Sequence, residues 1–502
     1  MVVNLKNLYC GIDIGTSSAK TVVFNDEFEP LFKESISYEL INENKDWVAL
    51  DPDEVYQAVF NSLINCYDNV KEEGYDLSFI SFSSQLHSLI AVDENNNPLT
   101  NCITWADNRA GEFTDHIKKL YKEHDFYTKT GCPPHALYWP ARIMWLKKHR
   151  KETFNNTAKI VSIKDYIFKK LTDQYVIDYS LASGTGLLNI HKKEWEQDIL
   201  DILKINEDIL PDLVDGKDTL EMKPEIQSKL GKNIPLVVGS GDGPLANLGA
   251  GTISSRQLVV TIGTSGAARV FSDEPVLDKQ GDSIWCYMLD EDVYLPGGAI
   301  NNGGGIVLDW LENNIYSDFP GNFYKEADKY IEEVPAGSRG LLILPFLTGE
   351  RSPNWDPYAK GIMVGLSLSH DKKDIIKAAV EGITFRMYSV VKVLEKNLGK
   401  FDEVLVNGGF TNSEPWLQLM ADIFGSKIVV PSDPEASALG AVFMGMVASN
   451  IVDDYTDIES DMNIKEIKEP RQDIHQKYQE IYSLHEEIYN ANSQFFKTVS
   501  EL

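Results

Sequence analysis

The sequence predicts an α/β protein built from two related domains. Its 502 residues, 43% of them hydrophobic, exceed the length that one core usually spans, which is roughly 250 to 300 residues. Segments with helical periodicity alternate with short apolar segments typical of buried strands. The tetrapeptide Ile-Gly-Thr-Ser occurs from Ile14 and again from Ile262. Duplication of one domain is the simplest explanation of this repeat.

The first tetrapeptide lies at the tip of a predicted β-hairpin. Residues 8–14 form an apolar strand candidate that runs into small residues, and residues 19–24 are again typical of a strand. The pattern that follows alternates between helix and strand. Helices are predicted at 53–66, 143–148 and 164–171, and a strand at 77–82.

The second tetrapeptide has the same surroundings. Residues 257–262 and 267–271 are strand candidates on either side of it. The segment 236–251 is rich in glycine, which absorbs backbone rotation at low cost and suits a hinge. We therefore divide the chain near residue 245, into domains 1–245 and 246–502. An amphipathic helix over 474–499 is expected to dock on the body of the protein.

The charge of the chain excludes several classes of partner. Lys and Arg number 47 against 76 Asp and Glu, giving a formal net charge of −29. Such a surface repels nucleic acid and anionic membranes, and no apolar run reaches membrane-spanning length. The five cysteines lack metal-ligand spacing, so reduced structural thiols are expected. With polar residues where a signal peptide would be apolar, we expect a cytoplasmic protein.

Both tetrapeptide tips suit a phosphate group. Small-residue turns expose successive backbone N–H groups, and Thr and Ser hydroxyls add further donors. An ordinary turn remains the alternative for either tip alone. A P-loop is excluded, since no Gly-Lys pair precedes Ser or Thr. The candidates in the tips are Gly15, Thr16, Ser17, Gly263 and Thr264.

Two aspartates stand beside glycine-rich turns. Asp13 ends the first buried strand, where a carboxylate is costly unless a cation such as Mg²⁺ is near. Asp242 lies between Gly241 and Gly243, which let a ligand approach and suit a general base. Turn capping explains Asp13 equally well, and an Asp-Gly turn is the alternative for Asp242. Both are also candidate metal ligands.

Two further kinds of segment suit small ligands. Residues 85–87 and 105–109 combine amide, imidazole, indole, carboxylate and guanidinium groups, a mixture typical of a polyol pocket. The glycines at 303–305 and 408–409 allow a flat nucleotide to approach the backbone, with helix packing as the alternative.

The chain resembles the FGGY family of carbohydrate kinases over essentially its whole length. The motifs that carry the resemblance occur in the family's order. They are GIDIGTSSAK from Gly11, SFSSQLHS from Ser81, ITWADNRA from Ile103, GSGDG from Gly239, TIGTSG from Thr261 and GGFTNSEPW from Gly408. The segment from Gly361 to Glu381 also agrees with the family's C-terminal signature.

The resemblance implies an actin-like, ribonuclease-H-type fold in each half, with ATP and Mg²⁺ in the cleft between them. Asp242 would be the catalytic base. The resemblance implies that Thr16, Lys20 and Thr264 contact phosphates and that Gly305 and Gly409 line the nucleotide, with Asn412 or Ser413 as a further contact and Ser413 taken as the candidate. Asp13 and Gly408, identified above from their turns, complete the nucleotide side. Those implied on the sugar side are Leu86, His87, Trp105, Asp107 and Arg109.

The activity implied is ATP-dependent phosphorylation of a small sugar or sugar acid. D-Gluconate is the favoured acceptor, with Arg109 or His87 meeting its carboxylate, and D-xylulose is the second candidate. From another class, an actin-like ATPase would use the same paired phosphate hairpins without a sugar. The polyol segments at 85–87 and 105–109 count against it. A homodimer is left open as the assembly.

Overall fold

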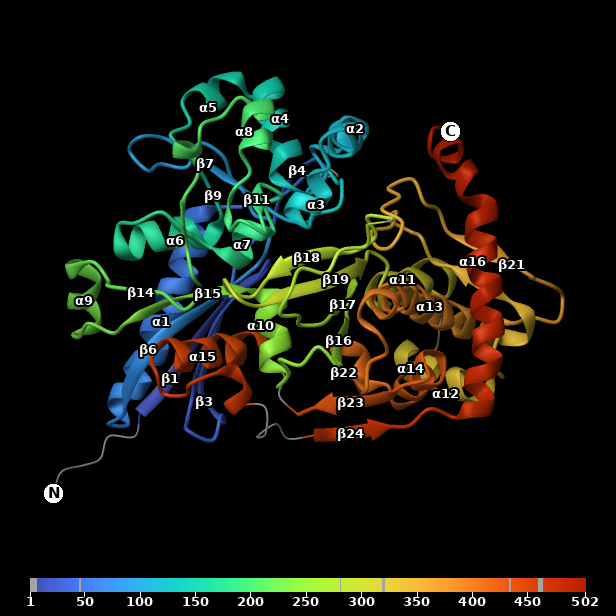
Figure 1. Cartoon of the computed structure of the whole chain (residues 1–502). Coiled ribbons are helices and arrows are strands. Elements are labelled where there is room, and N and C mark those ends of the chain that lie inside the picture. The colour runs from blue at the N-terminus through green and yellow to red at the C-terminus, as the bar shows by residue number, and fades with distance from the viewer. Residues whose placement is uncertain (1–6, 45–46, 280, 318–320, 433–434, 459–463) are drawn as a thin grey trace.

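The computed structural model describes residues 7–44, 47–279, 281–317, 321–432, 435–458 and 464–502. The first half is built on a six-stranded sheet in the order β14-β15-β6-β1-β2-β3 (Figure 1). Its antiparallel part is β1 (Asn7–Ile14), β2 (Ser18–Phe24) and β3 (Pro30–Ser37). The strands β6 (Asp76–Ser84) and β15 (Leu236–Gly241) run parallel to β1, and β14 (Thr219–Leu220) forms the edge.

The second half repeats this topology in a seven-stranded sheet, in the order β18-β19-β17-β16-β22-β23-β24. Its antiparallel part is β16 (Gln257–Ile262), β17 (Gly266–Arg269), β19 (Tyr294–Ile300) and β18 (Trp285–Met288). The strands β22 (Glu403–Asn407) and β23 (Lys427–Pro431) are parallel to β16, and β24 (Ile464–Lys468) is the antiparallel edge. The two tetrapeptide tips therefore occupy equivalent places, between β1 and β2 and between β16 and β17.

Long helices join the equivalent strands. In the first half α1 (Pro52–Glu72) connects the meander to β6, and Asp51 caps it by accepting from the backbone N of Asp53 at 2.8 Å. In the second half α13 (Lys372–Leu398) has the same place before β22. The C-terminal helix α16 (Gln472–Ser500) packs along the outer side of the second half (Figure 1) and buries Tyr478, His485 and Phe496.

An additional lobe lies between β6 and β15. Its helices are α2 (Thr114–His124), α3 (Phe126–Thr130), α4 (Trp139–His149), α5 (Lys151–Asn155), α6 (Ile163–Thr172), α7 (Tyr179–Ser183), α8 (Gln197–Leu203) and α9 (Pro224–Leu230). Short strands β7 (Ile90–Val92), β8 (Cys102–Ile103), β9 (Lys159–Val161), β10 (Val176–Asp178), β11 (Leu188–Asn189), β12 (Glu194–Trp195) and β13 (Asp212–Val214) complete it, with β4 (Ile41–Asn44) and β5 (Trp47–Leu50) before α1. The second half adds α11 (Gly304–Trp310), α12 (Phe323–Glu333), α14 (Glu414–Phe424), β20 (Leu342–Leu344) and β21 (Ile362–Val364).

The two halves meet through a pair of crossed helices. The helix α10 (Asp242–Gly249) follows β15, and α15 (Ala436–Ala448) follows β23. They pack against each other, and α15 lies on β1 and β6 of the first half (Figure 1). Each helix contains the dipeptide Leu-Gly, from Leu248 and from Leu439, and an alanine follows it in both places. This interface therefore repeats the internal symmetry of the chain.

The observed elements match the sequence expectations closely, and the five cysteines are free and buried as predicted. The proposed division near residue 245 falls inside α10. We keep domains 1–245 and 246–502 as a proposal, with the crossed helices as the joint. In the part of the chain that the structure describes, no helix combines the length and apolarity needed to cross a membrane.

Glycine is required where α10 and α15 cross. A Cβ on Gly249 would lie 1.8 Å from the carbonyl O of Ala436, and one on Gly440 would lie 2.0 Å from that of Leu245. Because these neighbours are backbone atoms, they cannot move aside without separating the helices.

We expect Gly249→Ala to lower the free energy of unfolding by about 1 to 3 kcal/mol, as overpacking does. Urea unfolding followed by circular dichroism measures this change. The matched control is Gly111→Ala, since no atom lies within 4 Å of a Cβ built there. Equal unfolding midpoints for the two variants would contradict the close crossing.

Candidate active site

A cleft of about 570 Å³ opens between the two halves. Its walls come from β1, β2, α10, β17, the turn after β22 and the start of α15. The predicted residues Asp13, Lys20, Asp242, Gly408 and Gly409 all line it. The cleft thus brings together residues from both equivalent sheets.

A smaller pocket of about 310 Å³ lies beside this cleft. Leu86, His87 and Trp105 line it, and all three are expected from the sequence on the sugar side. The opposite side comes from the second half and supplies aromatic rings and a cation. These residues are Trp285, Tyr287, Arg351 and Trp355.

The cleft and the pocket meet at one carboxylate and one guanidinium. Asp242, Gly243 and Arg269 line both hollows. A Cβ on Gly243 would lie only 3.2 Å from Nε of Arg269, so the glycine leaves room for that guanidinium beside Asp242. A group held in the cleft and a group held in the pocket would therefore face each other across Asp242 and Arg269.

The electrostatics at this junction favour a carboxylate that can take up a proton. Burial, then the charge of Asp13, raise the pKa of Asp242 to about 6, while the Arg269 charge opposes the rise. Burial also raises the pKa of Asp13, against the hydrogen bond that Ser83 Oγ donates to its Oδ1 at 2.9 Å. A carboxyl with a pKa near neutrality suits general base catalysis.

Two carboxylates close enough for the charge of Asp13 to raise the pKa of Asp242 also suit a divalent cation, since oxygen ligands are those that Mg²⁺ prefers. In the described ranges, no group of three His, Cys, Asp or Glu side chains gathers as a metal site. A metal here would need ligands beyond Asp13 and Asp242, and phosphate oxygens are the usual ones for Mg²⁺.

The first tetrapeptide tip borders the smaller pocket through Thr16. Trp105 donates its indole N–H to Thr16 Oγ1 at 2.9 Å, and Gln85 Nε2 donates to the carbonyl O of Gly15 at 2.9 Å. Thr16 lines the pocket, while Ser17 is exposed at the tip. Lys20 forms an ion pair with Glu435 at 2.7 Å. The phosphate roles predicted for this tip remain predictions.

The second tip is covered by the glycines that follow β19. Backbone N of Gly303 donates to Thr264 O, and N of Gly305 donates to Gly263 O, both at 3.0 Å. A Cβ on Gly305 would lie 3.0 Å from Thr264 Cα, so this segment packs on the tip. Ser413 caps α14, accepting from the backbone N of Trp416 at 3.3 Å. Their nucleotide roles also remain predictions.

His87 is a neutral member of the pocket. Burial, with the charges of Arg142 and Arg351 adding to it, lowers its pKa to about 3. Its Nδ1 lies 2.6 Å from the carbonyl O of Gly184, which can only accept, so Nδ1 carries the hydrogen. His87 can therefore form hydrogen bonds with a ligand but cannot supply a positive charge at neutral pH.

Asp107 and Arg109 lie outside the residues that line the pocket. Their side chains form a two-bond ion pair, at 2.8 and 2.9 Å. The guanidinium lies over the rings of Trp47 and Trp145, and Asp107 also accepts from the backbone N of Val48. These contacts are structural, so the substrate roles expected for the pair remain predictions without support from the pocket geometry.

The sequence analysis did not identify Arg269, Arg351 or the aromatic wall of the pocket. Arg269 is the charged residue in the apolar run Ala267 to Phe271, and Arg351 belongs to a Glu-Arg pair directly after an apolar segment. A charged residue at such a place is a signal for a partner or ligand. The aromatic residues carry no comparable signal, because buried aromatics are common in any core.

The fold and the site define a carbohydrate kinase: the chain belongs to the FGGY family of carbohydrate kinases. The family's N-terminal domain matches residues 8–249 and its C-terminal domain matches residues 258–449. The two-domain actin-like fold and the family expected from the sequence are thereby confirmed.

Individual members of the family are similar to this chain over most of its length. The gluconokinase of Bacillus subtilis (strain 168) is 41% identical over 463 residues, covering 90% of this chain and 89% of that protein. The crystal structure of gluconate kinase from Lactobacillus acidophilus superposes with a TM-score of 0.93 at 33% identity, over 98% of this chain and all of the other. A structure described as ligand-bound xylulose kinase from the same organism gives the same four values.

Proposed function

We propose that the protein transfers the γ-phosphoryl group of ATP to D-gluconate, giving ADP and 6-phospho-D-gluconate. The observation that carries the proposal is the place of Asp242, where the cleft and the smaller pocket meet. ATP would occupy the cleft and the acceptor would occupy the pocket. The 41% identity to a gluconokinase supports gluconate as the acceptor.

In this arrangement Asp242 takes the proton from the terminal hydroxyl of the acceptor. The oxygen of that hydroxyl attacks the γ-phosphorus in line. Positioning and charge neutralisation are the main contributions to such a transfer. Arg269 stands beside Asp242 and faces the charge that develops on the transferred group. Mg²⁺, held by Asp13, would neutralise phosphate charge on the ATP side.

The pocket favours an anionic acceptor over a neutral one. It carries two guanidinium groups, Arg269 and Arg351, whereas its histidine is neutral. A neutral ketose such as D-xylulose needs no cation. D-Xylulose stays the second candidate because of the equal structural likeness to a xylulose kinase.

An acceptor panel tests the proposal. ADP release would be coupled to NADH oxidation with D-gluconate, D-xylulose, D-ribulose and glycerol as acceptors. We expect the highest kcat/KM with D-gluconate. A higher value with D-xylulose would assign the second activity instead.

The pKa of Asp242 predicts the acid side of the pH profile. A general base acts only when it is deprotonated, and its folded-state pKa is raised to about 6. Activity should therefore be low well below pH 6, rise through that value and be level above it. Measured as kcat/KM for gluconate at saturating MgATP, a profile that is flat from pH 5 to 8 would contradict this assignment.

A further inference from the structure

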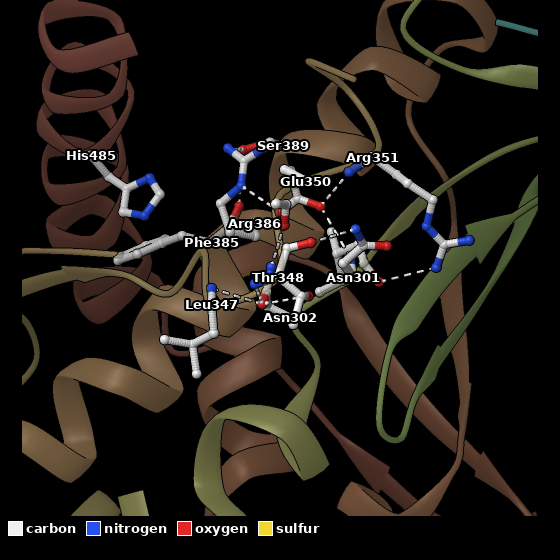
Figure 2. Close-up of polar contacts among 12 residues, drawn as sticks. Asn301, Asn302, Leu347, Thr348, Glu350, Arg351, Phe385, Arg386, Ser389 and His485 are labelled. Atoms are coloured by element: carbon white, nitrogen blue, oxygen red, sulfur yellow. Dashed lines mark hydrogen bonds and ion pairs between the residues drawn. The ribbon is translucent and has the colours of Figure 1, made fainter. Parts of the chain in front are cut away.

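A Glu-Arg pair in the second half connects the acceptor pocket to a buried ionic network (Figure 2). Glu350 and Arg351 lie in the loop that follows β20. Arg351 lines the pocket, with its guanidinium carbon 5.7 Å from the ring centre of Trp105. It thus reaches from the second half to a residue of the first.

The Arg351 guanidinium has unused hydrogen-bonding capacity. Toward the residues that the structure describes, it donates one hydrogen bond, a long one from an Nη to the carbonyl O of Ile300 at 3.5 Å, and its buried Nε has no partner among them. In the described parts of the chain, no carboxylate lies within ion-pair distance of it. Buried guanidinium groups normally have their donors satisfied, so an anion that enters the pocket would complete this one.

Glu350 fixes the backbone from which Arg351 projects. One carboxylate oxygen, Oε1, accepts from the backbone N of Asn301 at 3.1 Å and from that of Arg351 at 2.8 Å. The other, Oε2, pairs with Nε of Arg386 on α13 at 3.5 Å, and both side chains are at most 1% exposed. Arg386 also pairs with Glu486 at 3.4 Å, so loss of the Glu350 charge would weaken this buried network without leaving Arg386 unpaired.

Asn302 holds the three residues of the loop that come just before Glu350 (Figure 2). Its Oδ1 accepts from the backbone N of Leu347 and of Thr348, at 2.9 and 3.0 Å, and its Nδ2 donates to Gly349 O at 2.7 Å. After Glu350, the backbone N of Ser352 donates to the carbonyl O of Ala299 at 2.9 Å, so hydrogen bonds hold the loop both before and after Glu350. A guanidinium held by such a loop is pre-organised for one geometry.

The two arginines share the pocket but differ in what else they border. Arg269 also lines the cleft, and its charge acts on Asp242. Arg351 lines the pocket but not the cleft. Its charge helps to lower the pKa of two buried histidines, His87 and His135. An acceptor whose reacting hydroxyl faces Asp242 would extend into the pocket that Arg351 lines.

We infer that Arg351 binds the carboxylate of the sugar-acid acceptor, and that Glu350, paired with Arg386, is the residue that positions it. The inference rests on the proposed kinase activity and adds the residue that recognises the acid group. Neutral His87 and the Asp107-bound Arg109 do not supply this charge.

The first test compares gluconate with its neutral counterpart D-glucitol, in which a hydroxymethyl group replaces the carboxylate. Binding to the full-length protein would be measured by calorimetry, together with KM for gluconate. We expect Arg351→Gln to weaken the binding of gluconate by roughly 10- to 100-fold, as the loss of a charged hydrogen-bonded pair does. The dissociation constant for D-glucitol should stay within about threefold of the wild-type value. Arg351→Lys should retain part of the preference.

The second test concerns positioning. Glu350→Gln keeps an acceptor oxygen for the two backbone N–H groups but removes the charge that faces Arg386. We expect KM for gluconate to rise while kcat changes less, and the double variant Glu350→Gln/Arg351→Gln to be no worse than Arg351→Gln alone. Arg256→Gln, which breaks an exposed pair with Asp402, is the control for general charge loss.

The outcomes separate the inference from the function on which it rests. If the wild type phosphorylates gluconate but Arg351→Gln binds gluconate and D-glucitol as the wild type does, the inference is wrong. If the Glu350 and Arg351 effects add, or if Glu350→Gln lowers only the unfolding temperature, Glu350 has no positioning role. If the wild type does not turn over gluconate, the proposed function fails first and the inference falls with it.

Discussion

Asp242→Asn is expected to lower kcat by about 10²- to 10⁴-fold, the usual contribution of a general base. Asparagine has nearly the same shape but cannot accept the proton of the attacking hydroxyl. The dissociation constant of a non-hydrolysable ATP analogue should change little, because Asp242 occupies only the end of the cleft that faces the pocket. Single-turnover kinetics at saturating substrates measures the loss directly.

The chain offers a matched control for this variant. Asp215 is also partly buried, its pKa is likewise raised to about 6 by burial, and it accepts from the backbone N of Lys217. It lies outside both hollows. Asp215→Asn should therefore keep nearly full turnover. Near-normal turnover by Asp242→Asn would remove Asp242 from the mechanism.

Arg269→Gln is expected to lower kcat by about 10²- to 10³-fold, the loss typical of one pre-organised group that stabilises transition-state charge. The same loss should be seen with every acceptor, since the transferred phosphoryl group is common to all of them. Its effect on KM should be smaller than its effect on kcat. Comparing kcat and KM for D-gluconate and D-xylulose in this variant gives the measurement.

Arg269→Lys serves as the control that keeps the charge without the planar fork, and it should recover part of the rate. A result in which Arg269→Gln raises KM for gluconate alone and leaves kcat intact would transfer the carboxylate-binding role from Arg351 to Arg269. The two arginine variants thus test each other.

Most of the fold could be predicted from the sequence because its signals are local. Apolar runs, glycine-rich tips and the repeated tetrapeptide identify β1, β2, β16 and β17, and the observed bounds agree with the expected ones within a few residues. The crossing of α10 and α15 could not be derived in this way. It depends on backbone contacts at Gly249 and Gly440, which join segments nearly 200 residues apart.

The site was predictable where function and turn chemistry coincide. Asp13, Lys20, Asp242 and the glycines at 408–409 were identified from their motifs, and the structure brings them into one cleft. Asp107 and Arg109 belong to a motif of the same quality, yet their charges pair with each other. A sequence lists polar residues but does not state which of them satisfy one another.

Arg351 is a candidate functional residue that could not be predicted from the sequence. Its surroundings come from residues distant in the sequence, with Trp105 on one side and Ile300 on the other. Nothing local marks its Nε as unpartnered. Only the assembled pocket reveals a cation with open donors, which is why the sequence analysis assigned the carboxylate to Arg109 or His87 instead.

Phosphoryl transfer between two hollows that share Asp242 can be followed through the fate of the γ-phosphate. Wild-type protein would be incubated with MgATP, with and without D-gluconate, and ³¹P NMR would follow ATP, ADP, inorganic phosphate and phosphate monoester. We expect one 6-phosphogluconate for each ADP and almost no ADP without acceptor. ADP and inorganic phosphate formed at the same rate with and without gluconate would contradict it, and would indicate an ATPase with no sugar acceptor.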